Sequence, residues 1–329
     1  MTSTQEPSTS RIIVTHSGVF HADESLSIFL LRQIPRFSNA TVIRTRDESR
    51  MALADVVVDV GGVFDSSTLR FDHHQRPFEE TFPGFSTPLS SAGLVYRHFG
   101  KQIIKDRCPH LSDHLVELVH VRLYRNFVEA IDGIDNGVSQ YDTDVPKRYS
   151  ISTDLSSRVK NLNPCWNQSV VDVDHLFAKA VHLVGVEFWD ALDYIAGCWL
   201  PARAIVEKSV NERFSIDSSG RVVYLDIICP WKEHLLEIEE ELGLNADNNI
   251  LFCIYKDQDQ YRLGTVPLVR GSFELRRGIC QEWRGLRGEE LKVKSGISDA
   301  NFVHGSGFTG GAGSFESVLK MALLSIENK

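Results

Sequence analysis

The stretch RIIVTHSGVFHADESLSIFLL, residues 11–31, decides the architecture of the first half of the chain. RIIVT has the continuous apolar character of a buried strand, and the apolar residues of SLSIFLL recur at helical spacing. Further apolar runs at 41–45 (TVIRT), 54–60 (ADVVVDV) and 69–73 (LRFDH) are typical of short strands. A strand, a crossover helix and then more apolar strands predict an α/β fold built on a parallel sheet.

Acidic and imidazole side chains stand where three of these strands end, and where a long helix predicted over 111–131 ends. These residues are His16, His21, Asp23, Asp59, Asp72, His73, His74, Asp132 and Asp135. Because the carboxyl ends of parallel strands open onto one crevice, the strand-end groups are expected to converge there. Each one alone is compatible with an ordinary cap or turn residue. Their joint placement is what indicates a metal site.

The ligand chemistry narrows the expected metal. Mixed imidazole and carboxylate ligands suit Mn²⁺, Co²⁺, Fe²⁺ or Zn²⁺ better than Mg²⁺. The candidates exceed what one ion needs, which favours two ions that share a carboxylate, an arrangement that clamps the attacking and leaving oxygens of a phosphoryl centre. Asp59, alone at its strand end, is the natural bridge. The predicted reaction is therefore hydrolysis of a phosphate ester.

From about residue 221 the sequence pattern changes to short strand-like segments. VVYLDII, NNILFCIYK and QYRLGTV are typical of strands separated by Asn and Gly turns, and a glycine-rich run at 305–313 opens a helix predicted over 314–326. The mostly helical residues 172–213 form the connector. The expected divisions are a disordered tail over 1–10, a first domain over 11–195 and a smaller α+β domain over 196–329.

Composition excludes several classes of protein. The 329 residues carry 35 Lys and Arg against 44 Asp and Glu, a net charge of −9. This disfavours broad binding along duplex nucleic acid but permits a local phosphate site. The six cysteines form no C-x-x-C pair, which excludes a zinc ribbon or a thioredoxin-like site. With no apolar leader or long apolar stretch, we expect an intracellular protein with reduced thiols and no membrane span.

Four motifs, in order, resemble those of the DHH phosphoesterase superfamily: HSGVFHADE, VVVDVGG, FDHHQR and EAIDGIDNG. The likeness is closer still to its eukaryotic Myg (melanocyte-proliferating-gene) branch. It extends over RTRD, LSSAGLVYRHFG, LNPCWN, WLPARAIVE, CPWKEHL, EWRGLR and FVHGSGFTGG. The resemblance implies a DHH-type first domain, a DHH-associated second domain, and a metal-dependent 3′-to-5′ RNA exonuclease of mitochondria and the nucleus or nucleolus, with the cytoplasm as an alternative.

The resemblance also implies a ligand set. One ion is expected on His16, His21 and Asp59; the other is expected on Asp23, Asp59 and His73, together with Asp132 or Asp135. Asp132 is preferred because it continues the apolar helix FVEAID. His21 stands where most relatives have aspartate, and an imidazole in place of a carboxylate moves the expected metal towards Mn²⁺, with Co²⁺ or Mg²⁺ as alternatives.

The remaining candidates concern the substrate. Catalytic roles are expected for Asp59, for His74 as the neighbour that faces the phosphate, and for Arg203 as the arginine that holds phosphoryl oxygens. In the second domain the Gly-Gly-His that relatives often have is Gly310-Gly311-Ala312 here. Glycine backbone and the N-terminus of the last helix are left to cradle a phosphate, and a tight turn that packs on this helix is the alternative. The substrate-binding candidates are His74, Arg76, Arg203, Arg276, Trp283, Arg284, Gly310 and Gly311.

Three functions remain open from the sequence. The leading interpretation is a two-metal 3′-to-5′ RNA exonuclease that releases nucleoside 5′-monophosphates. The second is a phosphohydrolase of short oligonucleotides, cyclic dinucleotides or pyrophosphate, which the acidic net charge favours. The third is a non-catalytic regulatory protein, against which the complete ligand set argues.

Overall fold

The sheet of the first half has the strand order β2-β1-β3-β5-β4. Its strands are β1 (Ile12–Thr15), β2 (Thr41–Arg44), β3 (Val56–Val58), β4 (Phe64–Asp65) and β5 (Arg70–Phe71). All neighbouring pairs are parallel except β4 with β5. The computed structural model describes residues 10–141, 144–146, 148–168 and 171–327, so nine of the ten residues of the predicted disordered tail lie outside the described residues.

The strand order places a switch point between β1 and β3. From β1 the chain crosses to β2 on one side, and it then returns to β3 on the other side of β1. At such a reversal the segments that follow two adjacent strands diverge and leave a crevice beyond their carboxyl ends. Val56, Val57 and Val58 are at most 2% exposed, as expected for β-branched residues in a central parallel strand. The predicted α/β class is confirmed, and β4 makes the sheet mixed.

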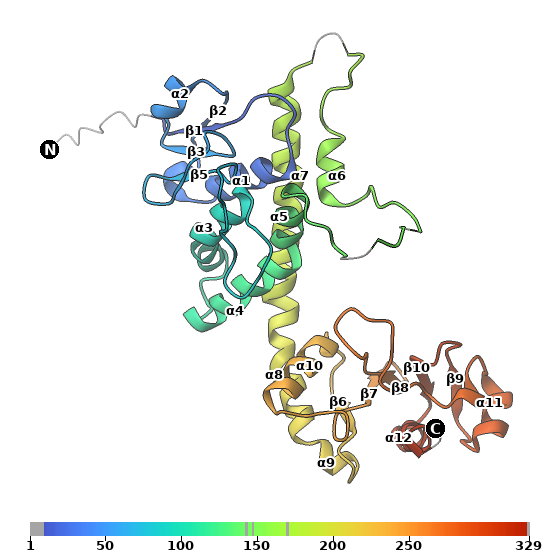
Figure 1. The fold of residues 1–329 in the computed structure, drawn as a ribbon. Helices are drawn as coiled ribbons and strands as arrows, with labels where there is room; N and C mark the ends of the chain where they lie inside the picture. Colours follow the sequence, from blue (N-terminus) through green and yellow to red (C-terminus); the bar gives the residue numbers. More distant parts are fainter. Residues whose placement is uncertain (1–9, 142–143, 147, 169–170, 328–329) are drawn as a thin grey trace. The chain divides into compact units, whose positions relative to one another are not determined.

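Helices cover this sheet and complete the first unit (Figure 1). Helix α1 (Ala22–Arg32) packs against α3 (Ser91–Arg107) and α7 (Val173–Tyr194). Most of α1 is buried, including the polar side chains of Asp23 and Glu24, which have no access to solvent. A polar group buried in this way needs partners, so the start of α1 already marks a place of special chemistry. The other helical elements are η1 (Pro35–Phe37), α2 (Glu48–Ala52), α4 (Asp113–Leu123), η2 (Tyr124–Val128), α5 (Glu129–Asp135) and α6 (Leu155–Lys160).

The chain divides into two units, residues 1–196 and 197–329. The division falls inside a helical stretch that runs from α7 through η3 (Ile195–Trp199) to α8 (Leu200–Asn211). None of the described helices combines the length and apolar character that crossing a bilayer needs. All six cysteines are free thiols.

The second unit is an α+β fold with the strand order β6-β7-β8-β10-β9. Only β6 with β7 is parallel. Its core joins Phe252, Leu263 and Met321 among other apolar side chains. Besides α8, the elements are α9 (Arg213–Ile216), β6 (Val222–Leu225), α10 (Trp231–Glu241), β7 (Phe252–Asp257), β8 (Gln260–Thr265), η4 (Gln281–Trp283), α11 (Gly288–Ser295), β9 (Ala300–Val303), β10 (Thr309–Ala312) and α12 (Phe315–Glu327).

The glycine-rich run at 305–313 differs from its prediction. Gly310 and Gly311 are not in a phosphate-cradling loop, because they form the middle of strand β10 between β8 and β9. A Cβ on Gly311 would lie 2.9 Å from the carbonyl oxygen of Tyr261. These glycines are explained by the close approach of neighbouring strands and of α12, not by a ligand.

Candidate metal centre

The centre is built from the residues that directly follow β1, β3 and β5. His16 follows β1, Asp59 follows β3, and the run from Asp72 to His74 follows β5. Asp59 has a left-handed backbone with φ of 55°, which is uncommon outside glycine and is better tolerated by Asp than by most residues. This conformation ends β3 and carries the Asp59 side chain into the crevice, where it is 4% exposed.

The first group of donor atoms comes from His16, His21, Glu24 and Asp59. Nε2 of His16 lies 3.0 Å from Oε1 of Glu24 and 3.3 Å from Oδ2 of Asp59. The His21 ring is half-exposed, and its Nδ1 lies 4.0 Å from Oε2 of Glu24. Sequence reasoning missed Glu24. It stands in the quoted HADE segment, but a glutamate three residues after a helix N-cap is expected to bond the cap backbone, which Glu24 also does with His21.

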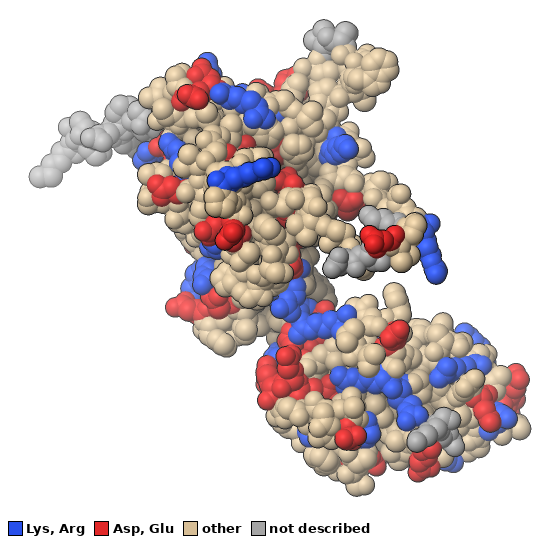
Figure 2. Space-filling model, viewed as in Figure 1, with Lys and Arg blue, Asp and Glu red and all other residues tan. Residues whose placement is uncertain are grey.

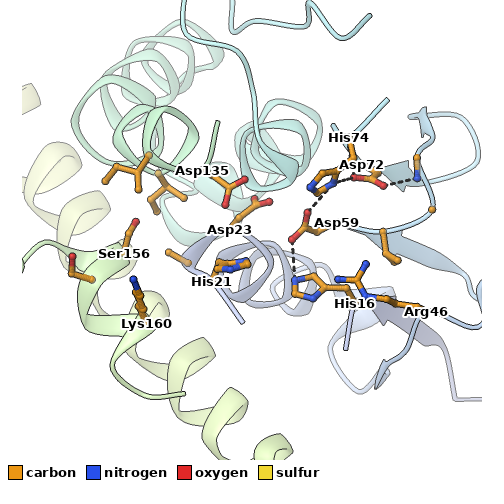
Figure 3. A pocket seen from close by; sticks show the side chains of 17 residues that line it. His16, His21, Asp23, Arg46, Asp59, Asp72, His74, Asp135, Ser156 and Lys160 are labelled. Carbon is orange, nitrogen blue, oxygen red and sulfur yellow. Dashed lines mark hydrogen bonds and ion pairs between the residues drawn. The ribbon is translucent and has the colours of Figure 1, made fainter. Parts of the chain in front are cut away.

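The second group comes from Asp23, His73 and Asp135. Nε2 of His73 lies 3.2 Å from Oδ2 of Asp135 and 3.8 Å from Oδ2 of Asp23. It also lies 3.6 Å from Oδ1 of Asp59. The two oxygens of Asp59 are therefore directed to different sides, Oδ2 to His16 and Oδ1 to His73 and His74, which are each 3.6 Å from Oδ1. Figure 3 shows this carboxylate between the rings of His16 and His74. Donor atoms of Asp59, Asp72, His73 and His74 form a third group that overlaps the other two.

These donor atoms fit divalent cations. Oδ1 of Asp59 and Nε2 of His73 are buried and make no hydrogen bond within the described part of the chain. A buried polar atom without a partner is costly unless an ion or water completes it. Neighbouring ligands of an octahedral ion with bonds of about 2.1 Å lie roughly 3 Å apart. The spacings of 3.0 to 3.6 Å between the His and carboxylate donors are close to that value.

The close contacts between imidazoles and carboxylates shift the pKa values of these side chains. Burial opposes the charged form of His16, but its contacts with Asp59 and Glu24 raise the pKa to about 10. His73 is likewise raised against burial, by Asp135 and Asp59, to a pKa of about 11. The pKa of Asp59 is lowered to about 2 by the two imidazoles, although burial acts the other way. Burial and the charges of Asp59 and Asp135 raise the pKa of Asp23. Without an ion, protons on the imidazoles balance the carboxylates.

Asp132 does not join any of these groups of donor atoms, which corrects the preference for it over Asp135. Its Oδ1 accepts hydrogen bonds from the backbone of Ser90 and Gly93, and its Oδ2 accepts one from the Tyr124 hydroxyl. The Ser90 hydroxyl lies 2.7 Å from an oxygen of both Asp132 and Asp23. Asp132 thus holds α5 against the start of α3 and orders the residues behind the centre. Asp135, one turn further along α5, is the carboxylate that reaches His73.

His74 lies at the edge of the centre and is oriented by Asp72. Nδ1 of His74 lies 2.7 Å from Oδ1 of Asp72, and the His74 side chain is 62% exposed. Asp72 itself is buried and accepts hydrogen bonds from the backbone of Gly62 and His73. This leaves Nε2 of His74 as the ring atom available to a ligand. Asn136 contacts Nδ1 of His73 at 3.2 Å and orients that ring in the same manner.

The centre forms the floor of a cavity of about 590 Å³. The cavity is lined by His16, His21, Asp23, Asp59, Asp72, His74 and Asp135 together with Arg46, Ser156 and Lys160, among others. Figure 3 shows Ser156 and Lys160 of α6 across the cavity from His16 and Asp59. Arg46 belongs to the RTRD segment quoted above, so a signal for it was present. Nothing in the local sequence around Lys160 indicates a site.

Two arginines predicted to bind the substrate, Arg76 and Arg203, do not line this cavity. Arg76 is exposed and is not among the residues that line the cavity. Arg203 lies in the second unit, where Glu207, Glu237 and Glu241 bind its guanidinium group. Such an arginine already has its counter-charges, so the structure gives it a structural role.

The three other candidates surround a second cavity, of about 1040 Å³, within the second unit. Arg276 binds Glu239 at 2.7 Å, and Trp283 is only 4% exposed. Arg284 donates through Nε to the carbonyl oxygen of Ile279, while its side chain remains exposed. Trp283 packs in the core and is not free to stack on a base.

Known proteins resemble this chain over nearly its whole length. Residues 12–326 match the MYG1_exonuc family, described as "Uncharacterised protein family (UPF0160)". The chain is 45% identical over 326 residues to the MYG1 exonuclease of Rattus norvegicus, an alignment that covers 96% of this chain and 85% of the relative. It is 44% identical over 326 residues to the MYG1 exonuclease of Homo sapiens, with 96% and 86% covered. A solved structure of RecJ from Thermus thermophilus in complex with Mn²⁺ is 12% identical, covers 97% of this chain and 52% of that chain, and has a TM-score of 0.26, too low to support a conclusion.

Proposed function

The chain belongs to the MYG1 exonuclease family (UPF0160), and we propose that it is a 3′-to-5′ RNA exonuclease that uses two divalent ions and releases nucleoside 5′-monophosphates. One observation carries the two-ion part of the proposal. The two oxygens of Asp59 are directed to separate groups of buried donors, one around His16 and one around His73. Relatives at 44–45% identity that are named exonucleases support the nucleic-acid substrate.

Two sets of residues that share Asp59 would hold the two ions. His16, His21, Glu24 and Asp59 would hold one ion, and Asp59, Asp23, His73 and Asp135 the other. Bound divalent ions neutralise phosphoryl oxygens and lower the pKa of water, which supplies the nucleophile at neutral pH. We propose Mn²⁺ as the native ion, because imidazole and carboxylate donors together suit it better than Mg²⁺.

His74 would act on the leaving group. The Asp72 carboxylate accepts the Nδ1 proton of His74, so that Nε2 faces the cavity. A protonated His74 can then donate from Nε2 to the departing 3′ oxygen of the shortened strand. Arg46, which lines the cavity and makes no ion pair within the described residues, replaces Arg203 as the proposed arginine for phosphoryl oxygens.

We further propose that residues 11–195 catalyse and that residues 196–329 bind the rest of the substrate. The second cavity supports this division, because Arg277 and Arg284 line it and make no ion pair within the described residues, whereas Arg276 and Lys294 are paired with Glu239 and Glu282. Guanidinium and ammonium groups around a hollow suit phosphate oxygens. We expect the protein in mitochondria or the nucleus, with the cytoplasm as the alternative. Imaging of a tagged full-length chain tests that location.

A second candidate function is hydrolysis of short oligonucleotides. On the face drawn in Figure 2, Lys and Arg side chains are interspersed with Asp and Glu, and no continuous basic track is visible. A long strand would gain affinity from such a track. The rates of cleavage of a dinucleotide, a pentanucleotide and a 25-nucleotide RNA distinguish the two functions. The short-substrate function predicts a rate that falls with length.

The proposed function is tested on metal-depleted protein with RNA labelled at its 5′ end. Mn²⁺ should restore a ladder of 5′-labelled products that shortens one nucleotide at a time, with nucleoside 5′-monophosphate released in solution. Immediate release of labelled mononucleotide would instead show digestion from the 5′ end. Absence of any product with Mn²⁺, Co²⁺ or Mg²⁺, on long and short RNA alike, would favour a non-catalytic role.

A further inference from the structure

Helix α6 forms the wall of the cavity that faces the candidate metal centre. Ser156, Ser157 and Lys160 line the cavity from this helix. Their spacing of one and four residues puts them on one helical face. The opposite side is anchored, because Val159 has no solvent exposure and Arg158 binds Glu187 of α7 at 2.8 Å. The packing of α6 therefore dictates that Lys160 is presented to the cavity.

The side chain of Asn163, three residues after the end of α6, binds the loop that carries the proposed ligand His21. Oδ1 of Asn163 accepts a hydrogen bond of 2.9 Å from the backbone of Phe20, and its Nδ2 donates at 2.8 Å to the Phe20 carbonyl oxygen. Phe20 directly precedes His21, a proposed ligand. Asn163 also bonds the carbonyl oxygen of Lys160. The backbone at Lys160 is thus held at a set position relative to the candidate centre.

The ammonium group of Lys160 has no carboxylate partner among the described residues, although the cavity is rich in acids. Those acids have other partners. Asp59 and Asp135 contact imidazoles, Asp72 contacts His74 and backbone, and Asp23 contacts Ser90 and the start of α3. A cation that lines a cavity without an internal partner is available to an anionic ligand.

We propose that Lys160 binds a second phosphate of the substrate, one nucleotide away from the scissile phosphodiester. The scissile phosphate belongs at the candidate metal centre, on the floor of the cavity. Lys160 lies across the cavity from Asp59 and His16 (Figure 3), with the hydroxyl of Ser156 beside it. A strand that enters the cavity presents its next phosphate to this wall. The inference rests on the proposed function and specifies how the same site recognises its substrate.

The consequence is a preference for substrates with two phosphates. ApA carries only the scissile phosphodiester, whereas pApA and ApAp carry a further phosphate on the 5′ or the 3′ side. A charge-assisted hydrogen bond at a partly exposed site contributes enough free energy for a preference of roughly tenfold. The wild-type protein should therefore cleave at least one of pApA and ApAp with a kcat/KM roughly tenfold above that for ApA.

The test combines these three substrates with three variants. The measured quantity is the kcat/KM for the preferred one of pApA and ApAp divided by the kcat/KM for ApA. Lys160→Gln should reduce this ratio to about one, and Lys160→Arg should retain most of it. Lys179→Gln removes the same charge from an exposed position on α7 that is not among the cavity-lining residues, and should leave the ratio unchanged. Thermal melting of each variant checks that it is folded.

The outcomes separate the two proposals. If the wild type cleaves ApA, pApA and ApAp equally well, or if Lys160→Gln keeps the wild-type ratio, Lys160 does not bind a second phosphate. A fall in kcat/KM that is equal for all three substrates would place Lys160 at the scissile phosphate and also overturn the inference. If the wild type with Mn²⁺ cleaves none of them, nor longer RNA, the proposed function itself has failed.

Discussion

Nε2 of His73 lies 3.2 Å from Oδ2 of Asp135, so that the end of strand β5 meets the end of helix α5. Asp132, one turn earlier on α5, is turned to Ser90, Gly93 and Tyr124. The two carboxylates of the same motif therefore have different tasks. We propose that Asp135 holds an ion, whereas Asp132 holds α5 against the start of α3.

Substitution of each carboxylate by its amide should separate these tasks. Asp135→Asn should weaken Mn²⁺ binding at least tenfold with little change in Tm, because a ligand is lost at a partly exposed position. Asp132→Asn should lower the free energy of unfolding by about 2 kcal/mol, because an amide nitrogen would face buried donors that now meet a carboxylate. Calorimetric metal titration and thermal melting measure the two effects. The reverse pattern would restore Asp132 as the ligand.

Asp59→Ala should abolish activity at every Mn²⁺ concentration and lower the number of bound ions. The reason is that one carboxylate faces both groups of donors. Metal analysis of the dialysed protein, together with turnover across a Mn²⁺ titration, checks both statements. Near-normal turnover at high Mn²⁺ would exclude a shared carboxylate. Asp65→Ala is a matched control, because Asp65 bonds only its neighbours Ser67 and Thr68 in the interactions described.

Metal binding should release protons at neutral pH. The pKa values of about 10 for His16 and about 11 for His73 are raised, so both imidazoles are protonated in the metal-free protein at pH 7. An ion can bind only the neutral ring. Apparent affinity should thus rise with pH, roughly tenfold per pH unit for each proton displaced. Titration calorimetry in buffers of different ionisation enthalpy counts these protons. A binding enthalpy that is independent of the buffer would contradict the assignment.

His21→Asp should shift metal preference towards Mg²⁺. The substitution adds a hard anionic oxygen in place of an imidazole at a half-exposed position, where the fold should tolerate it. The measurement is the ratio of kcat/KM with Mg²⁺ to that with Mn²⁺, in the variant and the wild type. An unchanged ratio would mean that His21 is not a ligand, in which case Glu24 completes the first group without it.

His120 should make the protein less stable in acid. Its ring lies against Phe82 and Tyr96 and is 2% exposed, and burial lowers its pKa to about 4. A lowered pKa means that the unfolded chain binds the proton more tightly. The stability linked to His120 is therefore present above pH 6.5 and is lost as the pH falls towards 4, by at most about 3 kcal/mol.

Comparison of the wild type with His120→Gln isolates the contribution of His120 to the pH dependence of stability. Denaturant unfolding of the wild type and of His120→Gln, between pH 7 and pH 4, compares slopes and not absolute stabilities. The contributions of His16 and His73 are the same in both proteins and cancel. The wild type should lose more stability over this interval than the variant. Parallel curves would show that His120 is not buried as a neutral ring.

Much of the centre was predictable because it depends on local order along the chain. A residue that directly follows a buried strand must lie at the carboxyl edge of the sheet, and the strands around Val14, Val57 and Phe71 are visible in the pattern of apolar residues. The order along the chain alone therefore predicts that His16, Asp59 and His73 lie together. The same reasoning was insufficient for Glu24, because the capping of α1 already explains a glutamate at that position.

The sequence by itself determined the α/β class and the strand ends that bear the donors, since these follow from short-range periodicity. Only the tertiary structure decided which side chains reach the centre. Asp132 and Asp135 lie three residues apart on one helix, about 60° apart around its axis. The packing of α5 against α3, not local propensity, selects between them. Tertiary packing also decides the other cases. Gly310 and Gly311 pair with β8 as part of strand β10, and three glutamates bind Arg203. The anchored side of α6 leaves Lys160 facing the cavity.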